Sequence, residues 1–287
     1  MSLLRGRTAL ITGGGRGIGL AIAKAFAREQ ADLFLVARTL SELEAAAEGI
    51  RREYGVRCSA FRADVSKPAE VAAMTRACVS ELGRVDILVN NAGVYGPIGE
   101  LVENDLEEWR QAIEVNLLGA VYATHAVLPA MRAQGGGCIL NLAGAGIGGP
   151  AVTPRISAYA TSKAAIVQFT ESISREAAAW NVQVNAIAPG AVITEITNAV
   201  IAAGPEKAGR DFYERNVKQK EKGGDSPELA ANLAVLLASG RTGQLTGKLL
   251  SAKWDKLEKL DPAAANQSSL YALRRIDGVL FGEVPKV

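Results

Sequence analysis

Two residues four positions apart, Tyr159 and Lys163, have the side-chain types and the spacing for proton transfer. On a helix, positions i and i+4 share a face one turn apart, so we expect the phenol and the ammonium to lie close together. An isolated tyrosine has a pKa of about 10, and a cation within ~4–6 Å lowers it. Such a phenol can give a proton to a carbonyl oxygen or take one from an alcohol. The alternative is an amphipathic helix with an interfacial tyrosine and a lysine whose stem covers apolar surface.

Asn116 is the third candidate for this site, because it interrupts an otherwise apolar helical stripe where asparagine is disfavoured. A buried amide needs partners, commonly water or backbone carbonyls. We expect Asn116 either to hold a water that links Lys163 to solvent or only to cap a kink in its helix.

A glycine-rich loop lies between a short β-like run at 8–11 and a stretch of helical periodicity. Glycines there let backbone N–H groups approach a pyrophosphate, and the following helix N-terminus adds partial positive charge. Glycines also occur in tight turns for steric reasons alone. The position between strand and helix favours phosphate binding. The residues assigned to this dinucleotide site are Thr12, Gly13, Gly15, Arg16, Gly17, Ile18 and Gly19.

Arg38 follows the second expected strand, where an NAD site typically offers an acidic side chain to the ribose 2′-hydroxyl. A planar, permanently charged guanidinium suits a 2′-phosphate instead. Arg16 can reach the same phosphate from the other side. We therefore expect NADP(H) as the cofactor; the alternative is that Arg38 is a solvated surface residue.

Further candidates for the cofactor site follow the later strands. The carboxylate of Asp64 either accepts from the adenine amino group or caps the helix that begins at Pro68. Thr194 is expected to bond a cofactor amide or phosphate. The remaining candidates, several of which are also turn formers, are Val65, Asn91, Ala92, Gly93, Pro189, Gly190 and Val192.

Short apolar runs alternate with longer helical stretches, and these elements must position the candidates. Strands are expected at 8–11, 33–36, 58–62, 87–89, 138–142 and 182–187, and the pattern stops after 248–250. Helices are expected from 18 and at 41–52, 68–82, 105–131 and 157–180. Nearly continuous apolar strands between helices indicate a parallel sheet covered on both faces. The expected fold is an α/β, doubly wound, Rossmann-type sheet that binds ligands at the carboxyl edge of its strands.

The chain has 287 residues, of which 48% are hydrophobic and 22% charged, as in an ordinary globular protein. We predict one NADP-binding and catalytic domain over 1–254, with a less regular, mobile substrate-side flap at 195–226. A polar C-terminal extension over 255–287 carries an apolar patch at 270–273, which needs burial, for example across a neighbouring subunit.

Several other classes of function are excluded by charge and composition. A net charge of +2 without a dense Lys/Arg run does not point to nucleic acid. No apolar stretch reaches the ~20 residues of a membrane span, and the N-terminus does not have the pattern of a signal peptide. Cys58, Cys78 and Cys138 are widely spaced, and His125 has no ligand partner near it, so we expect no metal site, reduced cysteines, a structural histidine and a cytoplasmic location.

Taken together, the motifs resemble the short-chain dehydrogenase/reductase family. They are TGGGRGIG, DV, NNAG, the Asn of EVNLLG, YATSK and PGAVIT, in that order from about Arg7 to about Leu250. The resemblance implies that Asn116, Tyr159 and Lys163 are catalytic, with Tyr159 as the acid/base and Lys163 also bonding the nicotinamide ribose. It implies that Thr194 helps to bind the nicotinamide, that Arg16 and Arg38 belong to an NADP-type site, and that the substrate is a small carbonyl compound or alcohol. It also implies a homodimer or homotetramer that uses the 105–131 and 157–180 helices.

One position departs from the family pattern. The family usually carries a serine after the fifth strand, which hydrogen-bonds the substrate oxygen, whereas this chain has Ala143 and Gly144. Removing one such donor costs on the order of 10²–10³ in rate. Ser157, Thr153 or a backbone N–H of the glycine-rich run is the expected substitute. The departure leaves open a second class of function, an NADP(H)-binding sensor or scaffold with little or no catalysis.

Overall fold

The computed structural model describes residues 2–144, 147, 152–257, 260–269 and 271–273. Within these residues, seven strands form one parallel sheet in the order β3-β2-β1-β4-β5-β6-β7. The strands are β1 (Thr8–Thr12), β2 (Asp32–Ala37), β3 (Cys58–Arg62), β4 (Ile87–Asn90), β5 (Gly137–Leu142), β6 (Val182–Ala188) and β7 (Leu249–Ser251). The predicted doubly wound, Rossmann-type sheet is confirmed.

The central strands β1 and β4 are buried along their whole length because both of their faces are covered. All residues of β1 and of β4 are buried, as a parallel sheet between two helical layers requires. The strand order reverses at β1, which pairs with β2 on one side and with β4 on the other. The connections diverge at the carboxyl ends of β1 and β4, which is where open α/β sheets bind ligands.

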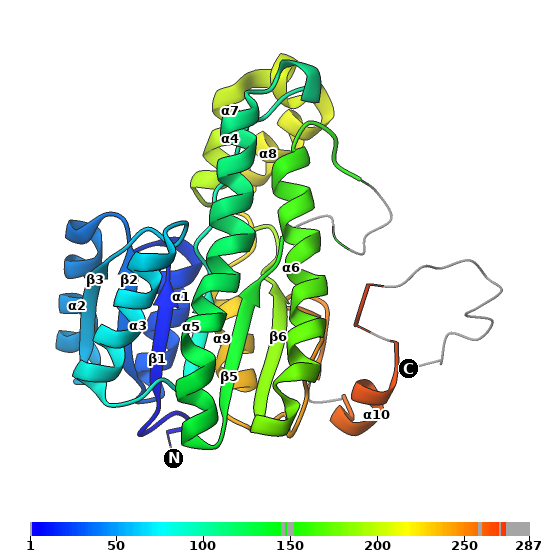
Figure 1. Cartoon of the computed structure of the whole chain (residues 1–287). Helices are drawn as coiled ribbons and strands as arrows, with labels where there is room; N and C mark the ends of the chain where they lie inside the picture. Colours follow the sequence, from blue (N-terminus) through cyan, green and yellow to red (C-terminus); the bar gives the residue numbers. More distant parts are fainter. Residues whose placement is uncertain (1, 145–146, 148–151, 258–259, 270, 274–287) are drawn as a thin grey trace.

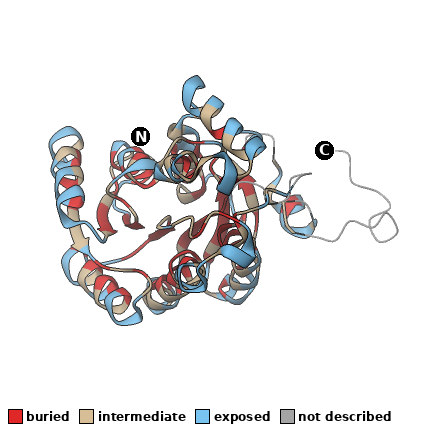
Figure 2. Cartoon of the chain, turned by 90° about the horizontal axis from the view of Figure 1, so that it is seen from above, coloured by how far each residue is buried: buried red, intermediate tan, exposed pale blue. Residues whose placement is uncertain are grey.

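Helices cover both faces of the sheet (Figures 1 and 2). One layer holds α1 (Gly17–Arg28), α2 (Leu40–Tyr54) and α9 (Pro227–Ala238), whose buried side chains share one core with β1 and β2. The other layer holds α3 (Pro68–Leu82), α5 (Gly119–Gln134) and α6 (Ser157–Glu176), which pack in a second core. Figure 2 shows the buried residues concentrated between these layers and the sheet.

The helix expected at 105–131 is interrupted in the structure. It consists of α4 (Leu106–Ile113), a π-helical turn η2 (Glu114–Leu118) and α5, and a short 3-10 turn η1 (Leu101–Glu103) precedes it. The π turn contains Asn116, whose side chain bonds the chain after β4 instead of staying in the helical stripe. The helix expected at 157–180 also ends earlier, at Glu176, the last residue of α6. A separate 3-10 turn, η3 (Ala178–Trp180), follows it.

The segment 195–226 is more regular than the sequence suggested. It forms two helices, α7 (Glu195–Ala208) and α8 (Arg210–Lys222), which lie beyond the carboxyl edge of the sheet (Figure 1). Gly204, at φ +77°, kinks the first helix, and Gly209 separates the two. The glycines in this segment therefore lie at a kink and at the boundary between two helices, which the sequence pattern did not reveal. We refer to α7 and α8 as the lid.

Part of the C-terminal extension packs on the same chain. The carbonyl of Tyr271 accepts a hydrogen bond from the N–H of Leu249 at 2.7 Å, and the side chains of Tyr271 and Leu273 lie against the apolar cores. A short helix, α10 (Pro262–Gln267), leads to this contact. Leu270 lies outside the described residues. Among the helices that are described, none combines the length and apolarity that a membrane crossing needs.

Candidate active site

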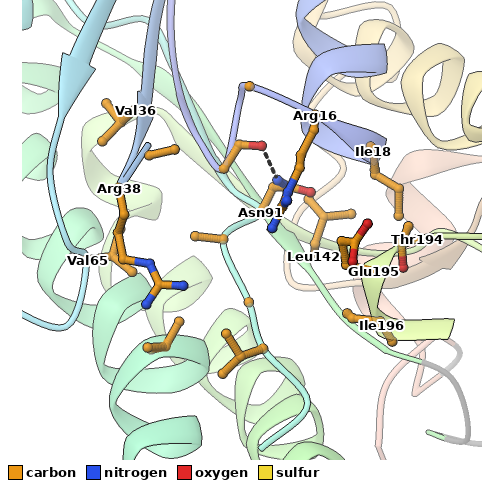
Figure 3. Close-up of a pocket in the computed structure, with 18 of the residues that line it drawn as sticks. Arg16, Ile18, Val36, Arg38, Val65, Asn91, Leu142, Thr194, Glu195 and Ile196 are labelled. Atoms are coloured by element: carbon orange, nitrogen blue, oxygen red, sulfur yellow. Dashed lines mark hydrogen bonds between the residues drawn. The ribbon is translucent and has the colours of Figure 1, made fainter. Parts of the chain in front are cut away.

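A cavity of about 450 Å³ opens at the carboxyl edge of the sheet, where the strand order reverses (Figure 3). It is bordered by the β1–α1 loop, by the ends of β2, β3, β4, β5 and β6, and by one face of α6. Of the residues predicted from the sequence, those that line it are Gly13, Gly15, Arg16, Gly17, Ile18, Arg38, Asp64, Val65, Asn91, Ala92, Gly93, Tyr159, Lys163, Pro189 and Thr194. Those behind the lining are Thr12, Gly19, Asn116, Gly190 and Val192.

The glycine-rich loop is packed too closely to carry side chains. A Cβ on Gly19 would lie 2.2 Å from the carbonyl oxygen of Gly13, and one on Gly13 would lie 2.6 Å from Nδ2 of Asn91. Asn91 donates from Nδ2 to the carbonyls of Thr12 and Gly13, at 2.9 and 3.1 Å. The Thr12 hydroxyl accepts from the N–H groups of Asn91 and Ala92. This loop thus exposes backbone to the cavity at the N-terminus of α1, which suits an anionic diphosphate.

Two arginines extend into the cavity from different elements (Figure 3). Arg38 follows β2 and is exposed, and Arg16 stands just before α1 with 64% of its side chain exposed. The guanidinium of Arg16 lies 3.6 Å from the carboxylate of Glu42, in the first turn of α2. Sequence reasoning missed Glu42 because its place beside Arg16 depends on how α1 and α2 pack.

Asp64 forms a local turn rather than a helix cap. Its carboxylate accepts from the N–H and the hydroxyl of Ser66, at 2.9 and 2.7 Å, and the residue that precedes α3 at the cap position is Lys67. The helix-cap alternative is therefore wrong. Burial raises the pKa of Asp64, but the Ser66 hydrogen bonds and the charge of Arg38 outweigh it and lower the pKa overall. A carboxylate thus borders the cavity beside Val65.

Tyr159 and Lys163 lie on the buried face of α6. Nζ of Lys163 donates to the carbonyl oxygen of Leu142 at 2.7 Å and lies 5.9 Å from the centre of the Tyr159 ring. Burial raises the pKa of Tyr159 to about 12 and lowers the pKa of Lys163 to about 8. The expected lowering of the tyrosine pKa is therefore wrong for the chain by itself, because burial disfavours the phenolate. At neutral pH the phenol is protonated and the lysine mostly charged.

Asn116 fixes the chain after β4. Its side-chain oxygen accepts from the N–H of Val94 at 2.8 Å, and its Nδ2 donates to the carbonyl of Val94 at 2.8 Å and to the hydroxyl of Ser162 at 2.9 Å. The amide is buried behind Gly93, where a Cβ would lie 3.2 Å from Oδ1 of Asn116 and 3.5 Å from Nζ of Lys163. The contacts of Asn116 are thus to protein groups at a distorted helical turn.

Gly144 follows β5, where the family resemblance leads us to expect a serine. A Cβ built there would lie 2.8 Å from the phenolic oxygen of Tyr159 and 2.8 Å from Cγ of Lys163. The phenol therefore rests against the backbone of this residue. Ser157 accepts a hydrogen bond from Nε1 of Trp109 at 3.0 Å, and neither Ser157 nor Thr153 lines the cavity. Most of the glycine-rich run after Gly144 lies outside the described residues.

The chain after β6 is tied to the segment that follows the lid. The carboxylate of Asp225 accepts from the N–H of Ala191 and from Nζ of Lys253, each at 2.8 Å. Gly190, at φ +89°, has no room for a Cβ because the Asp225 carboxylate lies 2.9 Å from that point. Thr194 lines the cavity and also caps α7.

The cavity also contains residues that sequence reasoning did not single out. Those at strand ends follow from the fold once the sheet order is known, whereas those on the lid follow only from the position of α7. They are Val36, Ala37, Thr39, Glu42, Ala63, Val94, Val115, Leu142, Ile193, Glu195, Ile196 and Asn198.

The cysteines and the histidine play no part in this cavity. Cys58, Cys78 and Cys138 are free and buried, and burial raises the pKa of each thiol to about 12. His125 is exposed on α5. Within the described part of the chain, no group of three or more His, Cys, Asp or Glu side chains could hold a metal ion.

Comparisons with known proteins agree with this arrangement. Residues 7–203 match the family model described as short chain dehydrogenase. D-beta-hydroxybutyrate dehydrogenase of Cupriavidus necator is 35% identical over 253 residues, covering 86% of this chain and 96% of the relative.

Two solved structures are similar over most of their length. NAD⁺-bound xylitol dehydrogenase has a TM-score of 0.79 and 28% identity, covering 86% of this chain and 98% of its own. L-sorbose reductase from Gluconobacter frateurii, complexed with NADPH and L-sorbose, has a TM-score of 0.78 and 33% identity, covering 91% and 100%. The family match, the sheet order and the cavity at its switch point agree, and the chain belongs to the short-chain dehydrogenase family of oxidoreductases.

Proposed function

We propose that this chain transfers a hydride between NADP(H) and a small carbonyl or alcohol substrate, with Tyr159 as the acid/base. The observation that carries the proposal is the position of Tyr159 and Lys163, which line the same cavity as the glycine-rich loop. The relatives named dehydrogenase or reductase support catalysis over the sensor alternative.

The cavity has the groups that a dinucleotide needs. Backbone N–H groups before α1 suit the pyrophosphate, and the tight packing at Gly13 and Gly19 keeps side chains out of that place. Arg38 and Arg16 supply two permanent positive charges where a 2′-phosphate is expected. This pair favours NADP(H). Among the similar structures, one is named with NAD⁺ and another with NADPH, so the preference rests on these side chains.

The residues around the phenol have distinct tasks in the proposed reaction. A bound nicotinamide supplies the hydride for reduction or accepts it in oxidation. The protonated phenol of Tyr159 gives its proton to the carbonyl oxygen, which becomes the alcohol hydroxyl. The charge of Lys163 stabilises the phenolate left behind, and its hydrogen bond to the carbonyl of Leu142 keeps the ammonium at that place.

The surface supports a homodimer or homotetramer. Leu101 and Val102, just before the 105–131 region proposed as an interface, are 59% and 89% exposed, and Leu106, at its start, is 70% exposed. Neighbouring apolar side chains this open to solvent are typical of an interaction surface.

The test is NADPH oxidation over a panel of ketones and ketoses, read at 340 nm, with the wild-type protein and with Tyr159→Phe. We expect turnover of at least one compound by the wild type and loss of turnover in the variant, with unchanged NADPH binding. Tight NADPH binding without turnover of any compound would contradict the proposal and favour a sensor.

A further inference from the structure

A second phenol lies directly on the ring of Tyr159. The ring of Tyr95 is stacked on it, with ring centres 4.5 Å apart and an angle of 20° between the planes. Tyr95 follows β4 by five residues and comes from the chain segment that also lines the cavity with Gly93 and Val94. Tyr95 itself is not among the residues that line the cavity, but its side chain is only half-buried, so part of it stays accessible to a small molecule.

The backbone on both sides of Tyr95 is held in place. The N–H and the carbonyl of Val94 are both bonded by the amide of Asn116, at 2.8 Å each. On the other side, Gly96 adopts φ +71°, and a Cβ there would lie 2.7 Å from Cβ of Ala112 and 3.3 Å from Cβ of Ala158. The segment therefore packs tightly on α4 and α6, and the Tyr95 ring has a fixed platform beside Tyr159.

Tyr95 and Gly144 contact Tyr159 at different places. The phenolic oxygen and Cε1 of Tyr159 lie 2.8 and 2.9 Å from the point where Gly144 would carry a Cβ. The ring face of Tyr159 is covered by Tyr95. A serine at 144 thus conflicts with the phenol as it stands, whereas Tyr95 brings a hydroxyl-bearing side chain to the same group.

We propose that the Tyr95 hydroxyl donates the second hydrogen bond to the substrate oxygen, beside the bond from Tyr159. Burial, and then the charge of a Tyr159 phenolate, raise the pKa of Tyr95. The Tyr95 phenol therefore keeps its proton throughout the reaction and acts only as a donor. A donor at a developing oxyanion contributes more in the transition state than in the ground state, so it affects turnover more than binding. This inference rests on the proposed function.

The test is Tyr95→Phe, which keeps the stacked ring and removes only the oxygen. We expect kcat to fall by about 10- to 100-fold, which is less than the roughly 10²–10³-fold fall that the loss of an oxyanion-hole donor typically causes. KM should stay within about threefold, and NADPH affinity and Tm should stay unchanged, because the stack remains. Tyr122→Phe, which removes the hydroxyl of a partly buried phenol on a different helix, α5, is the matched control and should have wild-type kcat.

The outcomes separate this inference from the proposed function. Wild-type turnover with unchanged kcat in Tyr95→Phe overturns the role of Tyr95 alone. A fall in kcat that accompanies a lower Tm or weaker NADPH binding identifies a structural role and also overturns it. Absence of turnover in the wild type over the whole panel overturns both. Tyr95→Leu, which removes ring and hydroxyl, is expected to lose at least as much kcat as Tyr95→Phe.

Discussion

Replacing Gly144 by serine introduces the residue that the family resemblance leads us to expect after β5, and the structure predicts that this change lowers activity. Two effects oppose each other. A correctly placed hydroxyl donor is worth on the order of 10²–10³ in rate. The new Cβ, however, would lie 2.8 Å from the phenolic oxygen and 2.8 Å from Cγ of Lys163, both closer than carbon atoms approach other groups in proteins. The serine hydroxyl can therefore be placed as a donor only if the phenol of Tyr159 moves.

The steric effect is expected to prevail. Both contacts involve buried side chains, and overpacking a core typically costs about 1–3 kcal/mol. A misplacement of about 1 Å at a reacting group can itself cost about 10²-fold. We therefore expect kcat/KM of Gly144→Ser to fall at least about tenfold, with Tm lower by several degrees, about what 1 kcal/mol produces in a domain of this size.

The assay is NADPH oxidation with the best substrate of the panel, together with thermal unfolding. Gly144→Ala carries the same Cβ without the hydroxyl and should behave like the serine variant. Gly49→Ser on α2, where no atom lies within 4 Å of the new Cβ, controls for the substitution itself and should keep wild-type activity. A Gly144→Ser protein that is faster than the wild type would refute the steric reasoning.

Three further outcomes follow from the same structure. Arg38→Asp should lower the preference for NADPH over NADH by about 10- to 100-fold, since hydrogen bonds to charged groups are worth ~1.5–3 kcal/mol. If the ratio of kcat/KM with NADPH to kcat/KM with NADH is unchanged, this cofactor assignment is ruled out. The pKa of Lys163 falls from 10.5 to about 8 on folding, so the unfolded chain binds more protons than the folded chain between these pH values. The free energy of unfolding of the wild type, relative to that of Lys163→Met, should therefore rise from pH 8 to pH 10.5. Urea titrations in which this difference stays constant or falls contradict the prediction. Arg155 adopts φ +67°, and its side chain bonds Glu100 and the lid carbonyls of Glu206 and Lys207. Arg155→Gly keeps that backbone conformation but removes these bonds, so limited proteolysis of the lid should be faster while Tm does not fall. Cleavage at the wild-type rate would show that these bonds do not hold the lid.

The parts of the molecule set by local patterns were predictable from the sequence. Continuous apolar strands and helical stripes gave the sheet class, and motifs at strand ends gave most of the cavity lining, because parallel strands bring their carboxyl ends to one edge. The lid was not predictable, since its glycines mark helix ends that resemble loop glycines in the sequence. The position of Glu42 beside Arg16 and the stack of Tyr95 on Tyr159 depend on packing between distant segments.

The electrostatics of the site also required the structure. The spacing of Tyr159 and Lys163 correctly placed both side chains on one face, but the direction of the tyrosine pKa depends on burial, which the spacing does not reveal. Asn116 was identified as unusual in its helix, whereas its partners, Val94 and Ser162, became known only from the π turn.

The central claim is that this chain moves a hydride between a nicotinamide and a substrate carbon while Tyr159 handles the proton. The most direct measurement is mass spectrometry of the alcohol product after reduction with NADPH deuterated at C4, in the wild type and in Tyr159→Phe. With the wild type we expect one deuterium on the former carbonyl carbon, from only one of the two C4-deuterated stereoisomers of NADPH. With the variant we expect no labelled product. Product that forms without label from either stereoisomer, or label transfer that persists at the wild-type rate in Tyr159→Phe, would contradict it.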